Sequence, residues 1–261
     1  MVLSYLIKGT FWLTAAGLIT RTAGFFYKIF LSRIIGAEEI GLFQLCMPLY
    51  TFCLAAASGG IQTALSRFTA EAEAKKDPEE TRRFLRIALF LTFFISLLLA
   101  FCLWGFSDVI AARFLLEVRC QWLLQLLALS LPFCAGHACL TGYFLGKKQA
   151  GITALSQLIE QGVRILTAVL CCLFLSGHTA KGASVLALGT LAGEGAACLY
   201  CLLHLPRLSF GKLHGKPLYI RPVAKHIFAI AAPLSLCRMM LCILQAIEAA
   251  LLPQQLQRYG L

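Results

Sequence analysis

Residues Gly9–Arg33 have the sequence GTFWLTAAGLITRTAGFFYKIFLSR, which is apolar apart from two interior cations, Arg21 and Lys28, and the terminal arginine. At about 1.5 Å per residue, the stretch is long enough to cross a bilayer as one α-helix. A guanidinium at mid-depth costs roughly 2.5–3.5 kcal/mol on insertion scales, so Arg21 requires a hydrated or protein-lined environment. The stretch therefore predicts a membrane-spanning helix with cations inside the membrane.

Helical spacing sorts the residues of this helix onto two sides. Small, polar and cationic residues share one stripe: Thr10, Thr14, Gly17, Arg21, Gly24 and Lys28. Large apolar side chains cover the rest of the helix. One interpretation is structural, with both cations snorkelling or contacting carbonyls at a helix–helix contact. We favour the second interpretation, in which the cationic stripe lines an inner cavity that binds an anion.

Composition predicts an all-α polytopic membrane protein. Hydrophobic residues make up 59% of the 261 residues and charged residues only 13%, whereas about a quarter of a soluble protein is charged. The net charge of +11 does not indicate a nucleic-acid partner, because the cations cluster in short segments between apolar stretches. Membrane lipids are the expected surroundings.

Seven apolar spans are expected, at residues 9–33, 41–66, 84–107, 121–145, 150–176, 182–205 and 226–253. Two connections are longer and hydrophilic: Arg67–Arg83, with a helix-breaking Pro78, and the basic Pro206–Lys225. A short interfacial helix is expected at Asp108–Arg119. The predicted organisation is a six-helix lobe at 1–205, a basic cytoplasmic loop at 206–225, and a seventh helix at 226–261 that begins a second lobe.

The distribution of cations predicts the orientation. With a cytoplasmic N-terminus, the inner segments carry 14 Lys and Arg residues and the outer segments carry 5. Because positive charge accumulates on the cytoplasmic side, the sequence predicts a multi-pass protein of the cell membrane with its N-terminus inside.

No motif indicates an enzyme, a cofactor or a metal site. The twelve cysteines lie almost entirely within apolar spans, where cysteine behaves as a small hydrophobe, and a single C-x-x-C at Cys198 and Cys201 is weak evidence for metal binding. There is no HExxH, no glycine-rich nucleotide loop and no pair of intramembrane aspartates.

Further charges fall within the later spans. Glu160 and Arg164 are four residues apart, so we expect them to form a charge pair on one helix face. Glu194 lies among glycines that permit close helix packing, and it is expected to meet a neighbouring cation or backbone group. If transport is coupled to a cation, Glu194 and Glu248 are the candidate residues that bind the coupling ion.

The seventh span resembles a restart of the first. Thirteen residues separate Lys8 from Arg21 and also Lys225 from Arg238, and the same shift of 217 positions carries Lys28 onto Gln245. Internal repeats are common in transporters, whose substrate sites lie where the repeats meet. The predicted substrate-binding residues are therefore Arg21, Lys28, Arg238 and Gln245.

The segment TGYFLGKKQAGITALSQLIEQGVRIL (Thr141–Leu166) closely resembles the stage V sporulation protein B family. These are flippase-type polysaccharide biosynthesis proteins of the multidrug/oligosaccharidyl-lipid/polysaccharide exporter superfamily. Segments Lys8–Leu45 and Pro233–Leu261 resemble the same family. Thr20-Arg21 matches a Thr/Ser-Arg pair in the first helix of the related lipid II flippases. The resemblance implies a two-lobed helical bundle that moves a polyprenyl-pyrophosphate-linked saccharide across the membrane by alternating access.

Family members have two lobes, whereas this chain covers one lobe and the first helix of the next. We therefore expect a truncated product or partial gene, completed by a C-terminal lobe or a second copy. Two alternatives stay open: a cation-coupled exporter of small amphiphiles, and a non-transporting membrane scaffold in envelope or spore-wall assembly.

Overall fold

The structure is a computed structural model that describes residues 2–174, 182–205, 231–245 and 247, and within these ranges the chain forms long α-helices. The elements are α1 (Val2–Ile34), α2 (Ala37–Leu54), a π-helical turn (Ala55–Gly59), α3 (Gly60–Ala74), α4 (Pro78–Gly105), α5 (Ser107–Val109), a second π-helical turn (Ile110–Phe114), α6 (Cys120–Gly146), α7 (Ala150–Phe174) and α8 (Gly182–Leu203). A further helix spans Ala231–Gln245. All twelve cysteines fall within the described ranges and are free thiols.

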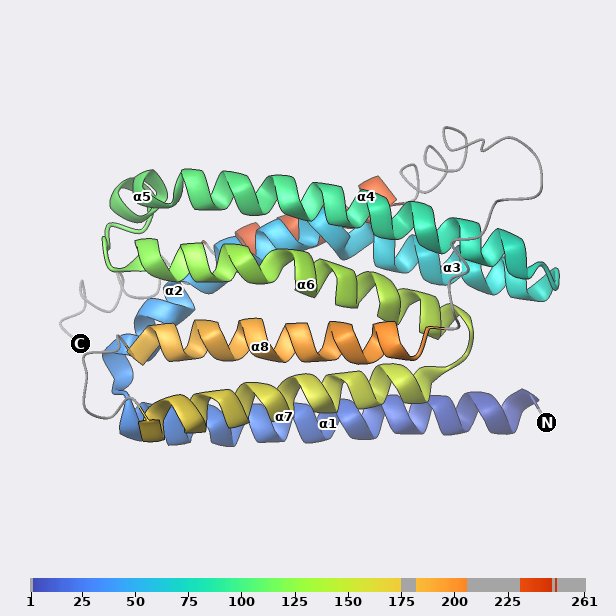
Figure 1. Cartoon of the computed structure of the whole chain (residues 1–261), viewed down its shortest axis with the longest axis horizontal. Helices are drawn as coiled ribbons and strands as arrows, with labels where there is room; N and C mark the ends of the chain where they lie inside the picture. Colours follow the sequence, from blue (N-terminus) through green and yellow to red (C-terminus); the bar gives the residue numbers. More distant parts are fainter. Residues whose placement is uncertain (1, 175–181, 206–230, 246, 248–261) are drawn as a thin grey trace.

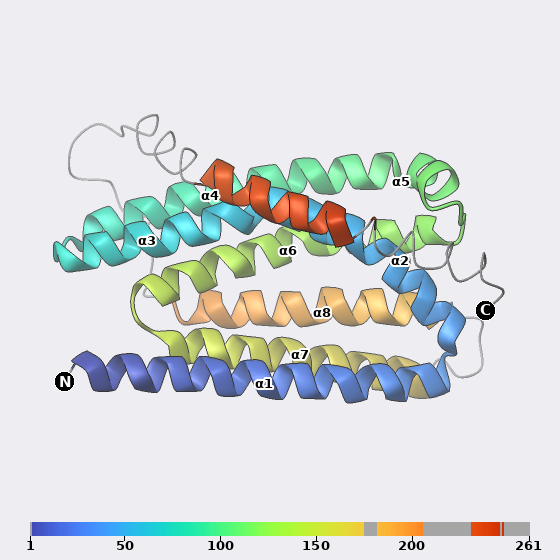
Figure 2. The same ribbon diagram turned by 180° about the vertical axis from the view of Figure 1, so that it is seen from behind.

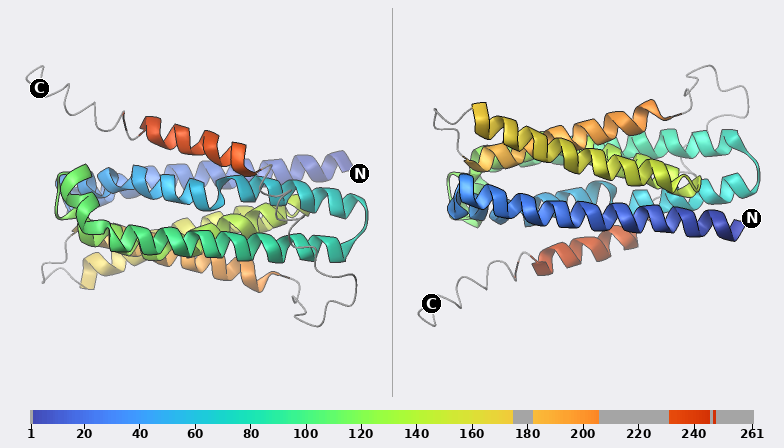
Figure 3. Two further views of the ribbon diagram at one scale, coloured as in Figure 1. Left: turned by 90° about the horizontal axis from the view of Figure 1, so that it is seen from above. Right: turned by 90° about the horizontal axis from the view of Figure 1, so that it is seen from below.

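The long helices lie roughly side by side, with α6 at the centre (Figure 1). Helix α6 packs against α8 on one side and against α3 and α4 on the other, while α7 packs against α8 and α1. Seen from behind, helix Ala231–Gln245 lies on the outside of this bundle (Figure 2). The views from above and below place it beside the segment formed by α2 and α3 (Figure 3).

The predicted fold class, an all-α polytopic membrane protein, is confirmed. Five helices are long and apolar enough to cross a membrane: Ala37–Ala74, Pro78–Gly105, Cys120–Gly146, Ala150–Leu173 and Gly182–Leu203. Helix α1 is also long enough, with 33 residues, but its threonines and Arg21 lower its hydropathy. The predicted basic loop 206–225 and the ends of the predicted seventh span lie outside the described residues.

One prediction about a connection is wrong. The hydrophilic stretch Arg67–Arg83 is mostly helical, because α3 continues to Ala74 and α4 begins at Pro78. Asp77 caps α4, its carboxylate accepting hydrogen bonds from the backbone N–H groups of Glu79 and Glu80, both at 3.0 Å. Pro78 therefore starts a helix rather than breaking one, since the first helical position needs no N–H donor.

The expected interfacial helix at Asp108–Arg119 is a short helical segment, Ser107–Phe114, between α4 and α6. Arg119 ties this connection to the start of α2 through ion pairs at 2.9 Å with Glu38 and Glu117. The connection lies at the end of the bundle opposite the α3–α4 turn (Figure 1).

Burial differs sharply between the central and peripheral helices. Helix α6 supplies many of the largest buried side chains, including Leu127, Leu131 and Tyr143. Helix α4 instead exposes large apolar side chains, among them Phe90 and Phe101 at 75% and 80%. An outward apolar face of this extent suits lipid rather than water. The chain is therefore a multi-pass membrane protein.

Close approach of α7 and α8 depends on a glycine. A methyl group at Gly193 would lie 2.7 Å from the backbone oxygen of Glu160, so only glycine permits the observed spacing. Small residues allow membrane helices to approach in this way. The contact brings Glu160 and Arg164 of α7 beside Glu194 of α8.

Candidate functional site

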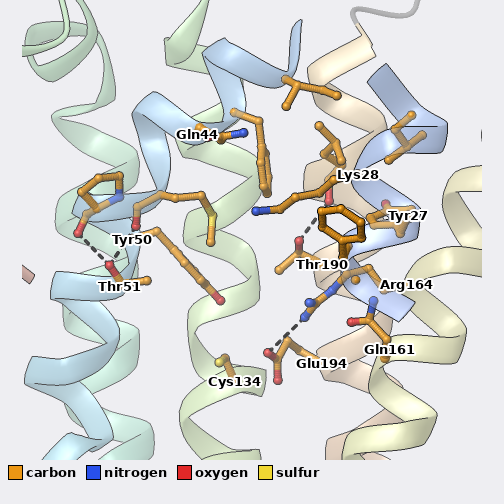
Figure 4. A pocket seen from close by; sticks show the side chains of 18 of the residues that line it. Tyr27, Lys28, Gln44, Tyr50, Thr51, Cys134, Gln161, Arg164, Thr190 and Glu194 are labelled. Atoms are coloured by element: carbon orange, nitrogen blue, oxygen red, sulfur yellow. Dashed lines mark hydrogen bonds and ion pairs between the residues drawn. The ribbon is translucent and has the colours of Figure 1, made fainter. Parts of the chain in front are cut away.

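A cavity of about 770 Å³ lies between α1, α2, α7 and α8. Figure 4 shows its side chains from close by. Its lining residues are Arg21, Gly24, Phe25, Tyr27, Lys28, Leu31, Ile40, Phe43, Gln44, Met47, Pro48, Tyr50, Thr51, Leu54, Cys134, Gln161, Arg164, Leu186, Thr190, Glu194 and Gln245. Several of the charged residues that the sequence identified in separate spans thus share one cavity.

The α1 wall is cationic and uncompensated. Arg21 and Lys28 are both exposed to the cavity, and Lys28 extends its ammonium group into the open space (Figure 4). Among the described residues, no carboxylate lies within ion-pair distance of either side chain. These two charges are therefore available to an anion that enters the cavity.

The α2 wall is polar and locally irregular. Pro48 lies inside α2 and has no backbone N–H, which removes one bond of the helical ladder. The Thr51 hydroxyl donates toward the carbonyl oxygens of Met47 and Pro48, both at 3.0 Å. Tyr50 is anchored by a hydrogen bond between its hydroxyl and that of Ser130, at 3.0 Å. Gln44, Tyr50 and Thr51 thus offer neutral polar groups opposite the cations.

The wall formed by α7 and α8 carries compensated charges. Arg164 forms an ion pair with Glu160, and its Nη2 lies 3.7 Å from Oε1 of Glu194. Glu194 Oε2 also lies 3.2 Å from Nδ1 of His137, on α6. Unlike the α1 cations, these charged groups lie within ion-pair distance of groups of opposite charge.

The predicted substrate-binding residues do not all lie together. Arg21, Lys28 and Gln245 line the cavity, whereas Arg238 is not among its lining residues. The Arg238 side chain lies against the backbone at Gly59, where an added methyl group would meet its Cδ at 3.0 Å. Of the two candidate coupling residues, Glu194 lines the cavity and Glu248 lies outside the described residues.

His137 is the important residue that the sequence reasoning missed. It is buried in α6, in the run LPFCAGHACL, and its partners come from α7 and α8. Its presence inside an apolar span was the available signal, since ionisable residues within the membrane are expensive and usually have a partner. Spacing along the chain cannot reveal partners on other helices.

The fold and the cavity define a multi-pass membrane protein with a cationic internal cavity formed between α1, α2, α7 and α8. A family comparison makes the assignment specific. Residues 6–253 match the family described as "Polysaccharide biosynthesis protein", and the chain belongs to that family.

Three proteins of Bacillus subtilis (strain 168) are similar to the chain. "Stage V sporulation protein B" is 34% identical over 74% of this chain and 38% of its own length. "Lipid II flippase MurJ" is 30% identical over 71% of this chain and 36% of its own length. "Uncharacterized membrane protein YabM" is 25% identical over 72% of this chain and 34% of its own length. The chain thus covers little more than a third of these relatives. No solved structure matches it significantly.

Proposed function

We propose that the chain forms the first lobe of a flippase that moves a lipid-linked saccharide across the cell membrane by alternating access. The observation that carries this proposal is the pair of cations, Arg21 and Lys28, which have no carboxylate partner among the described residues and lie on one wall of a cavity of about 770 Å³. The similarity to a lipid II flippase supports the same class of substrate. Transport rather than catalysis is the proposed activity.

The chemistry of the cavity suits a polyprenyl-pyrophosphate headgroup. An anion cannot leave water for hydrocarbon unless other groups replace its hydration. Arg21 would donate a planar fork of N–H groups to phosphate oxygens, and Lys28 would add a mobile point charge. Gln44 and Thr51 on the facing wall supply neutral hydrogen-bonding groups for a sugar. The polyprenyl tail would stay in the surrounding lipid.

The arrangement of basic turns supports a cytoplasmic N-terminus. The start of α1, the α3–α4 turn and the α6–α7 turn lie at the same end of the bundle (Figure 1). The α3–α4 turn contains Lys75 and Lys76, and the α6–α7 turn contains Lys147 and Lys148. With this end inside, outward movement of an anion is favoured by about 2.3 kcal/mol per charge per 100 mV of inside-negative potential.

The position of helix Ala231–Gln245 supports the hypothesis that the cavity is shared with a second lobe or a second copy of the chain. The backbone N–H of Gly60 donates to the Ser235 hydroxyl at 3.0 Å, which fixes this helix against the start of α3. Its other end brings Gln245 to the cavity. A partner lobe that follows this helix would close the side of the cavity opposite α7 and α8.

A second candidate is a cation-coupled exporter of small amphiphiles. The observation in its favour is Glu194, a carboxylate on the cavity lining, because carboxylates are the groups that bind a coupling proton or cation. Efflux of amphiphilic cations driven by a pH gradient, lost on Glu194→Gln, would support this function over the flippase.

Binding of a polyprenyl pyrophosphate to the full chain in lipid nanodiscs tests the proposal. Arg21→Ala should weaken binding about tenfold or more, since a hydrogen bond to a charged group contributes roughly 1.5–3 kcal/mol. Arg113→Ala is the matched control, because Arg113 lies between α4 and α6, away from the cavity. Unchanged affinity in the Arg21 variant would contradict the proposed binding site.

A further inference from the structure

Four charged or titratable side chains meet behind the cavity, one from α6, two from α7 and one from α8. They are His137, Glu160, Arg164 and Glu194. His137 and Glu194 are only 6% and 7% exposed. Arg164 and Glu194 also line the cavity, so the cluster lies between the buried interior of the lobe and the proposed substrate.

The hydrogen bonds of His137 suit a group that gains and loses a proton. Its Nε2 lies 3.0 Å from the Ser156 hydroxyl, and its Nδ1 lies 3.2 Å from Glu194. Ser156 Oγ also lies 2.9 Å from the carbonyl oxygen of Thr153. When both ring nitrogens carry hydrogen, Ser156 accepts from Nε2 and donates to Thr153. When the ring is neutral, Ser156 rotates and donates to Nε2, while Nδ1–H still donates to Glu194. Both states leave the ring fully hydrogen-bonded.

Formal charge favours uptake of one proton. Glu160 and Glu194 carry two negative charges, and Arg164 supplies one positive charge, so a neutral His137 leaves one uncompensated negative charge inside the lobe. An unpaired charge in a low-dielectric interior is costly. The other described titratable groups that face the cluster are neutral when protonated: Tyr27 of α1, Tyr50 of α2, Cys134 of α6, and Cys198 and Cys201 of α8. The next cations lining the cavity are Arg21 and Lys28, which pair with no described carboxylate.

Two buried polar groups show that the Arg164 side of the cluster has unused hydrogen-bonding capacity. Arg164 Nε and the Tyr27 hydroxyl both lack partners among the described residues. Tyr27 is only 8% exposed and lines the same cavity. Its hydroxyl lies near Arg164, with both residues facing Gly189. Both atoms are buried, so a ligand in the cavity that the two residues line would reach these donors only after the side chains move.

Protonation of His137 would change how many carboxylates Arg164 has to compensate. With a proton on His137, the imidazolium compensates Glu194, and Arg164 has only Glu160 to neutralise. Without that proton, Arg164 must compensate both carboxylates. An anion in the cavity therefore meets more positive charge when the site is protonated.

We propose that His137, Glu160, Arg164 and Glu194 form a proton-binding site whose occupancy strengthens anion binding in the cavity. The coupling to anion binding rests on the function proposed above, whereas the proton site itself does not. A divalent cation is the competing ligand, because His137, Glu160 and Glu194 offer ligand atoms within 4.8 Å of one another. The guanidinium between the two carboxylates disfavours it, since it already supplies positive charge there.

The first experiment measures the proton site without a substrate. The histidine rings of the full chain in nanodiscs are followed by NMR as the pH changes, and His137→Gln identifies the signal of His137. We expect this ring to titrate and its titration to shift strongly in Glu194→Gln. A ring that does not titrate, or is unaffected by Glu194→Gln, would overturn the proposal. Stoichiometric binding of Mn²⁺ or Zn²⁺ that is lost in His137→Gln would also overturn it, in favour of a metal site.

The second experiment measures the affinity for a polyprenyl pyrophosphate from about pH 5 to pH 11, a range that covers the ordinary titration of histidine and a titration displaced by the net negative charge of the site. Affinity should rise about tenfold as the site takes up its proton, within the usual range of coupling between two sites. His137→Gln should bind weakly at every pH, and His137→Lys, which carries a fixed positive charge, should bind tightly at every pH. If His137 had only a structural role, both substitutions would lower the affinity for the lipid to the same extent.

His204→Gln is the matched control, because His204 is an exposed histidine beyond the end of α8, and it should keep the full pH dependence. Wild-type affinity that does not change with pH would overturn the coupling. Titration of His137 without any pyrophosphate binding would leave the proton site standing and contradict the proposed function instead.

Discussion

The α1 wall and the α7–α8 wall of the cavity both carry arginine inside the membrane, yet the two arginines have opposite surroundings. Arg21 faces the cavity without a carboxylate partner among the described residues, whereas Arg164 is held by Glu160 and Glu194. A compensated arginine can stabilise the fold. An uncompensated one costs free energy in the unliganded lobe, and a ligand that supplies the missing negative charge offsets that cost. With the functions proposed above, the comparison separates a charge cluster that stabilises the fold and binds a proton from a surface that binds an anion.

The largest effect is expected where the compensated charges are broken. Arg164→Ala should destabilise the protein by about 3–5 kcal/mol, because it leaves the partly buried Glu160 without its cation and removes one of the two basic groups beside the buried Glu194. Chemical or thermal unfolding in detergent measures this loss. The double variant Arg164→Ala/Glu160→Gln should recover part of the stability, since it removes one of the unpaired charges. If Arg164→Ala were as stable as wild type, the ion pairs of Arg164 would not stabilise the fold, and the proposed difference between the two walls would be contradicted.

The next effect comes from giving the α1 cation Lys28 a carboxylate partner, as Arg164 already has. Gln44→Glu places a carboxylate on the wall facing Lys28 and should weaken binding of polyprenyl pyrophosphate about tenfold, through competition for the cation and repulsion of the ligand. Folding stability should stay the same or rise. Gln149→Glu is the matched control, because Gln149 is exposed in the turn between α6 and α7 and does not line the cavity. Tighter binding in the Gln44 variant would argue against an anionic ligand.

An effect of similar size is expected from separating α7 and α8. Gly193→Ala puts a methyl group 2.7 Å from the Glu160 backbone oxygen and should cost about 1–3 kcal/mol by overpacking. Gly195→Ala, two residues away, meets nothing within 4 Å and should be neutral or slightly stabilising. Unfolding measurements on both variants compare them directly. Equal stability of the two would mean that helix spacing does not position the cluster.

The smallest effect is expected at the exposed ion pairs of Arg119 with Glu38 and Glu117. The hydrogen bond from Arg119 holds the pKa of Glu117 below its ordinary value. The ion pair of Arg119 with Glu117 therefore stabilises the protein at neutral pH, and this stabilisation is lost as the pH falls through the pKa of Glu117 in the folded protein. Arg119→Ala should lower the unfolding temperature slightly at neutral pH and not at all in acid. A larger loss in acid than at neutral pH would contradict this account.

The α1 wall was more predictable from sequence than the α7–α8 wall. Helical spacing alone places Arg21 and Lys28 on one stripe, and a hydrophobic pattern of this length specifies a helix. The pairing of Glu160 with Arg164 is also local, four residues along one helix. The contacts of Glu194 and His137 cross between helices, so they depend on packing that no single segment encodes.

The misassigned connection has a similar explanation. Polar composition in Arg67–Arg83 suggested a loop, but α3 and α4 extend as polar helices beyond their apolar parts. The local signal was present in Asp77-Pro78-Glu79-Glu80, which is typical of a helix start. Arg238 was predicted to bind substrate because the spacing from Lys225 to Arg238 repeats that from Lys8 to Arg21. Spacing does not fix the direction of a side chain, and the packing of helix Ala231–Gln245 places Arg238 against Gly59.

The most direct test compares two lipids with the same polyprenyl chain, one bearing pyrophosphate and the other an uncharged alcohol, for binding to the chain in nanodiscs. The account predicts that wild type prefers the pyrophosphate lipid and that the Arg21→Ala/Lys28→Ala double variant loses this preference. Equal affinity of wild type for the two lipids, or a preference that survives in the double variant, would contradict it.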